Sequence, residues 1–102
     1  MVKGYWVARL NIHDQTAYEE YRKRNAIAFG LFGGKFLVRG GPFHAVVGEG
    51  RQHNVVIEFP SHDAAIACYR SPEYQDALQY LKAGCEVDLV IIGGYDGPQP
   101  GS

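Results

Sequence analysis

The sequence has little of several features that mark large functional classes. Only two of its 102 residues are cysteine, and Cys68 and Cys85 form no C-x-x-C pair, so we expect reduced thiols and a cytoplasmic protein. The formal net charge of −1 provides no positive surface for nucleic acid or an anionic membrane. No apolar run approaches the roughly 20 residues of a membrane span. The sequence has no basic segment followed by an apolar run, which is the pattern of a signal peptide, so we expect none.

Metal and cofactor motifs are also missing. The histidines have no metal-ligand spacing, and we interpret them as solvated or capping residues: His13, His44, His53 and His62. Gly33-Gly34-Lys35 is followed by no Ser or Thr and leads into a strand pattern, so it is not a phosphate loop. The sequence therefore predicts neither a metal nor a cofactor.

What the sequence does contain is the pattern of one small α+β domain, expected over residues 1–95 and followed by a Gly- and Pro-rich tail, 96–102. Strand patterns cover 4–12, 35–39, 54–59 and 86–95, and 43–47 resumes an extended pattern after Gly40-Gly41-Pro42. Helix patterns cover 15–32, 61–70 and 72–83, with caps at Asp14, Ser61 and Ser71. The order βαββαβ predicts a ferredoxin-like sandwich, an antiparallel sheet with its helices on one face.

Alternation along the strands divides their side chains between two faces of the sheet. One set is wholly apolar and is the expected floor for the helices: Trp6, Ala8, Leu10, Ile12, Phe36, Val38, Val55, Ile57, Phe59, Val87, Leu89 and Ile91. The other set mixes apolar and charged groups: Tyr5, Val7, Arg9, Asn11, Leu37, Arg39, Val56, Glu58, Asp88, Val90 and Ile92. No helix remains to cover this second, open face, so we expect a homodimer through it.

Four charged residues belong to the open face: Arg9, Arg39, Glu58 and Asp88. A simple hairpin centred near Gly48 places Arg39 almost opposite Glu58. The four side chains then form either an ion-pair network that holds a dimer in register or a polar site. In the site, Arg39 binds an anionic group and Glu58 acts as a base.

Aromatic residues from separate helices are expected to converge between the helices and the sheet. They form either the core of the domain or an apolar pocket with a few polar groups, suited to a small aromatic molecule. The candidate ligand-binding residues are Tyr18, Tyr21, Tyr69, Ser71 and Tyr74.

Three blocks resemble the family called domain of unknown function 1330: Phe36-Leu-Val-Arg-Gly-Gly41, Val56-Ile-Glu-Phe-Pro-Ser61 and Tyr69-Arg-Ser-Pro-Glu-Tyr-Gln75. The resemblance implies a dimeric α+β barrel, the superfamily of cofactor-free monooxygenases, muconolactone isomerase-like proteins and haem-binding relatives. It implies no established activity. The matching positions are Arg39, Gly40, Gly41, Glu58, Phe59, Ser71 and Tyr74.

Two functions follow as hypotheses. The first is a homodimer that binds a small organic ligand without chemistry of its own. The alternative is a cofactor-independent monooxygenase or isomerase that acts on a small aromatic or enolisable substrate. In that alternative Glu58 abstracts a proton and Arg39 stabilises the developing oxyanion.

Overall fold

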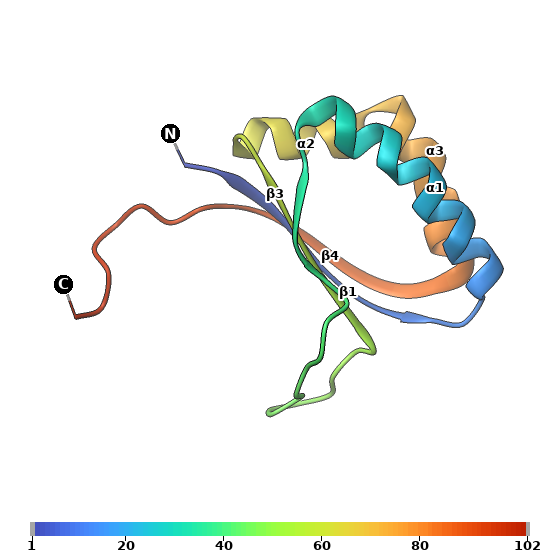
Figure 1. Ribbon diagram of the computed structural model, residues 1–102, viewed down its shortest axis with the longest axis horizontal. Helices are drawn as coiled ribbons and strands as arrows, with labels where there is room; N and C mark the ends of the chain where they lie inside the picture. The colour runs from blue at the N-terminus through green and yellow to red at the C-terminus, as the bar shows by residue number, and fades with distance from the viewer. Residues whose placement is uncertain (1, 102) are drawn as a thin grey trace.

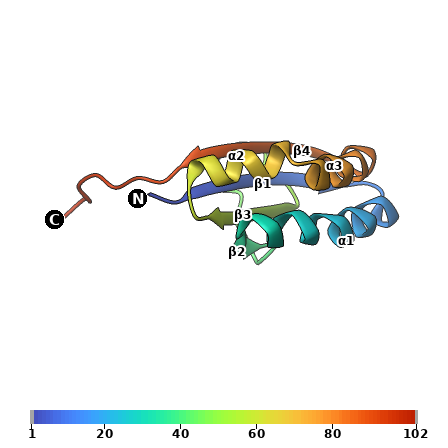
Figure 2. The same cartoon turned by 90° about the horizontal axis from the view of Figure 1, so that it is seen from above.

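The computed structural model describes residues 2–101, which form one antiparallel sheet with helices on one of its faces (Figure 1). The elements are β1 (Gly4–Ile12), α1 (Gln15–Phe32), β2 (Lys35–Arg39), β3 (His53–Phe59), α2 (His62–Arg70), α3 (Pro72–Gly84) and β4 (Cys85–Gly93). This order confirms the βαββαβ prediction, with the second helix divided at Ser71. Figure 2, seen from the helix side, shows α1 beside α2 and α3 above the strands.

The core lies between the helices and the central strands. The sheet order is β2-β3-β1-β4, so β1 is a central strand with a partner on each side. Trp6 of β1 is 2% exposed, and its indole N–H donates to the Ala65 carbonyl of α2 at 2.9 Å. Its ring meets Tyr74 of α3 edge to face, with 4.7 Å between centroids. The indole therefore ties the sheet to both parts of the second helix.

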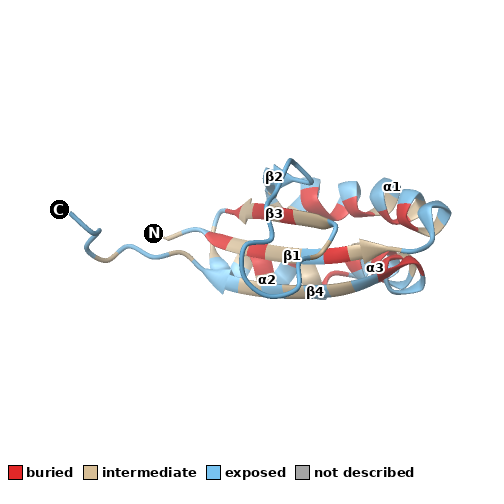
Figure 3. Ribbon diagram, turned by 90° about the horizontal axis from the view of Figure 1, so that it is seen from below, coloured by how far each residue is buried: buried red, intermediate tan, exposed pale blue. Residues whose placement is uncertain are grey.

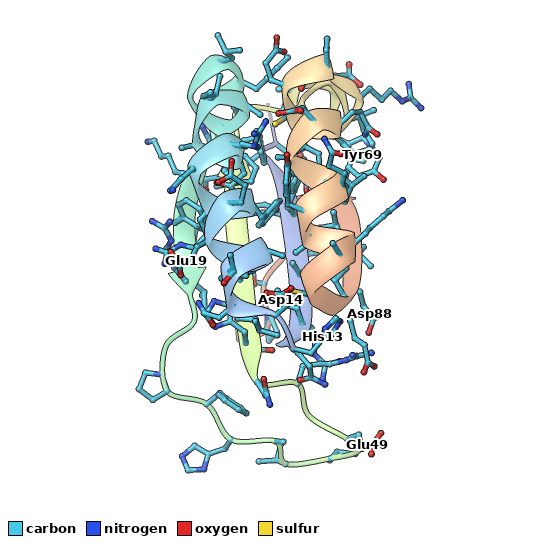
Figure 4. The ribbon with its side chains drawn as sticks, turned by 90° about the vertical axis from the view of Figure 1, so that its right-hand side faces the viewer. His13, Asp14, Glu19, Glu49, Tyr69 and Asp88 are labelled. Atoms are coloured by element: carbon cyan, nitrogen blue, oxygen red, sulfur yellow. The ribbon has the colours of Figure 1, made fainter. Side chains whose placement is uncertain are left out.

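The helix ends are fixed by the expected capping residues. The Asp14 carboxylate accepts from the Ala17 N–H, Ser61 Oγ accepts from the Ala64 N–H, and Ser71 Oγ accepts from the Tyr74 N–H. In addition, the backbone N–H groups of His13 and Asp14 both donate to the Gly84 carbonyl. Figure 4 shows His13 and Asp14 beside the end of α3, so the start of α1 is bound to that helix.

The hairpin between β2 and β3 differs from the prediction. Residues 43–47 form no strand but part of a loop, 40–52, that projects from the side of the sheet away from the helices (Figure 1). Gly40 has a left-handed φ of 69° and donates its N–H to the Asn54 carbonyl, which turns the chain away from β3. β4 also ends two residues earlier than predicted, at Gly93.

A β-bulge in β2 changes which side chains face the helices. Phe36 pairs with Ile57, but Val38 pairs with Val56 and Arg39 with Val55, so Leu37 is an extra residue. The alternation of β2 is reversed after the bulge. The prediction that Val38 faces the helices and Arg39 the open face is therefore wrong, since each lies on the other side.

Figure 3 looks onto the open face of the sheet, which no helix within residues 2–101 covers. Its exposed apolar side chains, 43% to 55% accessible, are Leu37, Val38, Val90 and Ile92. Val7 and Val56 between them are half-buried. The predicted excess of apolar surface on this face is confirmed. No helix within residues 2–101 combines the length and the apolar character needed to span a membrane.

Candidate functional site

A cavity of about 40 Å³ lies between α1 and the helix-facing side of the sheet. Its wall is mostly apolar, and besides Trp6, whose N–H donates to Ala65, the residues with polar groups are Tyr18, Tyr21, Arg22, Asn25, Arg39 and Tyr74. The exposed wall residues, Arg22, Phe36 and Arg39, come from α1 and the edge strand β2, so the cavity opens between these two elements. The volume is room for roughly three water molecules, at ~10–15 Å³ each.

Two tyrosine hydroxyls meet at the wall of this cavity. Tyr21 of α1 and Tyr74 of α3 lie 2.9 Å apart through their Oη atoms, and Tyr74 has no solvent exposure. Burial raises the pKa of Tyr21 to about 12, and burial together with Tyr21 raises the pKa of Tyr74. Both groups are therefore neutral at pH 7. One hydroxyl of the pair donates to the other, and Asn25 is a further hydrogen-bonding neighbour of the Tyr21 hydroxyl.

The mouth of the cavity is positively charged. The Arg39 guanidinium stacks over the Phe36 ring at 4.1 Å. Arg22 has one partner, Glu19, at 3.7 Å, and both side chains are about half exposed. His53 meets the Tyr18 ring edge to face at 5.9 Å. Burial, Arg22 and Arg39 together lower the pKa of His53, so the imidazole is neutral at pH 7.

The structure brings together four of the seven residues that the sequence singled out. Tyr18, Tyr21, Tyr74 and Arg39 all line the cavity, and Arg39 does so because of the bulge. The other candidate ligand-binding residues, Tyr69 and Ser71, lie outside it.

Ser71 and Tyr69 have structural contacts instead. Ser71 Oγ donates to the Cys68 carbonyl at 2.7 Å and accepts from the Tyr74 N–H, so it joins the two helices. The Tyr69 ring packs on Trp6 and Tyr74. In Figure 4, Tyr69 lies on the side of the molecule formed by α2 and α3, across from Glu19 on α1.

Glu58 lies on the open face and is separated from Arg39. It pairs in the sheet with Lys35 and Tyr5, and the Tyr5 hydroxyl donates to its carboxylate at 3.3 Å. The expectation that Arg39 stands opposite Glu58 is therefore wrong, because the long loop and the bulge shift the register and place the two side chains on different faces. Within one chain they cannot act on the same atom of a ligand.

The other two charged residues predicted for the open face, Arg9 and Asp88, contact residues of the loop. Arg9 donates to the Glu49 carbonyl in the loop, and Asp88 is paired with Arg51 at 2.9 Å, which also reaches Glu86. Figure 4 shows Glu49 at the far end of the loop and Asp88 near the sheet. The ion pairs of Asp88 and Glu86 thus depend on Arg51, a loop residue that strand alternation does not place on either face.

Two cavity residues, Arg22 and Asn25, were not among the site candidates, and neither was His53, which lies beside Tyr18. Arg22 follows Tyr18 by four positions and so lies on the same side of α1. His53 has the same strand alternation as Val55 and Ile57 and therefore faces the helices. Asn25 follows Tyr21 by four positions on α1, is 5% exposed and lies next to the Tyr21 hydroxyl.

No group of three or more His, Cys, Asp or Glu side chains within residues 2–101 forms a possible metal site. The two cysteines are free and buried. Burial raises the pKa of the Cys68 thiol to about 12, so it has little thiolate at pH 7.

Solved structures of the same fold cover nearly the whole chain. A protein of unknown function from Rhodopseudomonas palustris is 19% identical with a TM-score of 0.77, covering 94% of this chain and 85% of that one. SnoaB, a cofactor-independent oxygenase from Streptomyces nogalater, is 17% identical with a TM-score of 0.64, covering 98% and 99%. A dimeric ferredoxin-like protein of unknown function from Jannaschia sp. CCS1 is 19% identical with a TM-score of 0.61, covering 88% and 97%. At these identities the likeness shows the fold, and the predicted ferredoxin-like class is confirmed.

A search of curated proteins found no match. A family model does match, over residues 3–95, and its description is Domain of unknown function (DUF1330). The matched residues include all the helices and strands described above and therefore both walls of the cavity. The resemblance seen in the three sequence blocks is confirmed, and the chain belongs to the DUF1330 family.

Proposed function

We propose that this protein is a homodimer that binds a small organic molecule in the cavity between α1 and the sheet. One observation carries the proposal: polar groups from α1, α3 and β2 converge on an otherwise apolar cavity that opens to solvent. Apolar walls with a few fixed polar groups are the usual construction of a small-molecule site.

The walls favour a flat apolar body. Trp6, Phe29 and Phe36 contribute aromatic rings, and Leu10 and Ile57 contribute aliphatic side chains. The paired hydroxyls of Tyr21 and Tyr74 offer a polar point inside this wall. A ligand with a ring or short chain can pack its apolar part against these walls and hydrogen-bond one or two polar groups to the tyrosine hydroxyls.

A ligand of benzene size requires the cavity to enlarge, because apolar cavities that hold benzene measure about 150 Å³. The wall that can yield is β2, since every residue of this edge strand is exposed and only β3 holds it in the sheet. An outward rotation of Phe36 and Arg39 enlarges the cavity without disturbing Trp6 in the core. We therefore expect binding to be accompanied by a movement at β2.

The open face is the proposed dimer interface. Exposed Val90 and Ile92 extend its apolar surface along β4, and the neighbouring Jannaschia structure is described as dimeric. Burying a hydrophobic patch of this kind against a second copy removes it from water in both chains. In this arrangement Glu58 lies at the interface and the cavity lies on the opposite side of each sheet.

The oxygenase or isomerase alternative has narrower support. SnoaB has the same fold, but 17% identity carries no activity to this chain. The base and oxyanion group assigned to this reaction, Glu58 and Arg39, are on different faces of the sheet. Ligand binding needs only the cavity, so it is the function that the geometry supports best.

The test is ligand-detected nuclear magnetic resonance with benzamide, phenol and indole, using wild type, Ala8→Leu and Ala26→Leu. Ala8 lines the cavity, whereas Ala26 is exposed on α1 and controls for the substitution itself. We expect at least one compound to bind wild type and Ala26→Leu, and Ala8→Leu to lose that binding because leucine fills the cavity. Failure of all three compounds to bind wild type, or equal binding to a folded Ala8→Leu, would contradict the proposal.

A further inference from the structure

We infer that the ligand carries a carboxylate, which binds between the guanidinium groups of Arg22 and Arg39 while its apolar part enters the cavity. The inference rests on the proposed function and specifies the chemical class of the ligand. Arg22 projects from α1 and Arg39 from β2, so the two cations come from opposite walls of the same opening.

The two arginines act on a common site. The positive charges of Arg22 and Arg39 both act electrostatically on Tyr18 and on His53. The rings of Tyr18 and His53 are themselves in contact, at 5.9 Å between centroids. A group placed beside Tyr18 at the mouth is therefore within the field of both guanidinium groups.

The protein supplies little negative charge of its own at this mouth. Among residues 2–101, no carboxylate oxygen lies within 4.0 Å of a guanidinium nitrogen of Arg39. Arg22 has only the long, exposed contact to Glu19. By contrast, Arg24 reaches two carboxylates, at 2.9 and 2.7 Å. Arg39 thus has a free hydrogen-bonding fork beside an apolar cavity.

The position of Arg39 is also fixed in advance. Its guanidinium lies over the Phe36 ring at 4.1 Å, a stacked geometry that leaves the N–H edge free for hydrogen bonds. A carboxylate matches such a fork with two parallel hydrogen bonds. These groups together select a planar, singly charged anion over a neutral polar group.

The inference is tested with benzoate and benzamide, which have the same shape and differ in charge. Dissociation constants are measured by calorimetry or chemical-shift titration for wild type, Arg22→Gln, Arg39→Gln and the control Lys23→Gln. Lys23 is adjacent to Arg22 but 76% exposed and absent from the cavity wall, so its loss changes net charge equally. All three positions are exposed, and circular dichroism verifies that the variants fold.

We expect wild type to bind benzoate about tenfold more tightly than benzamide, the size of one charge-assisted hydrogen bond. Arg22→Gln and Arg39→Gln should each weaken benzoate about tenfold and leave benzamide within about twofold, and Lys23→Gln should change neither. Equal affinity of wild type for the two probes, or a benzoate preference that survives both arginine substitutions, overturns the inference and leaves the proposed cavity site intact. If neither probe nor any compound of the previous panel binds, the proposed function fails and the inference fails with it.

Discussion

The hydrogen bond between the Tyr21 and Tyr74 hydroxyls can be tested with a double-mutant cycle of Tyr21→Phe, Tyr74→Phe and the double variant. The two oxygens are 2.9 Å apart in a buried position, and Tyr74 has no exposure to an alternative water partner. Phenylalanine removes only the hydroxyl, so the ring packing of both residues is retained. The cycle therefore isolates the polar contact at the cavity wall.

The expected loss of unfolding free energy differs between the variants. Tyr21→Phe leaves the Tyr74 hydroxyl buried without a partner, which costs about 1–3 kcal/mol of unfolding free energy. Tyr74→Phe leaves Tyr21 beside Asn25, so its cost is lower, about 0.5–1.5 kcal/mol. The double variant has no orphaned hydroxyl, so it should be more stable than the sum of the single losses predicts, by about 1 kcal/mol.

The assay is urea unfolding followed by circular dichroism at one fixed protein concentration, since the stability of a dimer depends on concentration. Alkaline pH gives a second measurement. Because the folded pKa of Tyr21 is about 12 against 10.0 for the ordinary group, its stabilising contribution is complete below pH 10 and is lost as the pH rises towards 12. Wild type should therefore lose stability faster over this range than Tyr21→Phe, by at most ~1.4 kcal/mol per pH unit.

Strict additivity of the two single substitutions would refute the reasoning, because the hydroxyls would then contribute independently. An alkaline profile that is the same in wild type and Tyr21→Phe would likewise show that Tyr21 ionises with an ordinary pKa and is not buried against Tyr74.

Three further predictions concern the open face and the second helix. Val90→Asp, on the open face, should shift the protein from dimer to monomer in sedimentation velocity, while Ala26→Asp on α1 should not; a dimer that survives Val90→Asp contradicts the proposed interface. Ser71→Ala should lower the unfolding free energy by about 1–2 kcal/mol in urea denaturation, because the hydroxyl both caps α3 and donates to the Cys68 carbonyl. A change near zero would show that water replaces the Ser71 hydroxyl. Cys68 and Cys85 should react with a thiol reagent only after unfolding; rapid reaction of the native protein would place a thiol at the surface.

The register of β2 shows where sequence reasoning fails. Alternation predicted the faces of β1, β3 and β4, as the burial of Trp6 and Ile57 and the place of Leu89 at the cavity wall confirm. In β2, however, three consecutive residues, Phe36 to Val38, are apolar, so either register satisfies the pattern and alternation cannot locate a bulge. The face of Arg39 depends on that bulge, and with it the choice between an interface charge and a cavity residue.

The sequence by itself determined the order of the elements, the caps at Asp14, Ser61 and Ser71, and the shortage of helix to cover the open face. These properties are local, since capping and side-chain periodicity involve residues only a few positions apart. Only the tertiary structure decided that Arg39 joins Arg22 at the cavity and that Tyr21 meets Tyr74, 53 residues away. Such contacts depend on how β2 pairs with β3 and how α1 packs on α3, and no short-range pattern encodes that geometry.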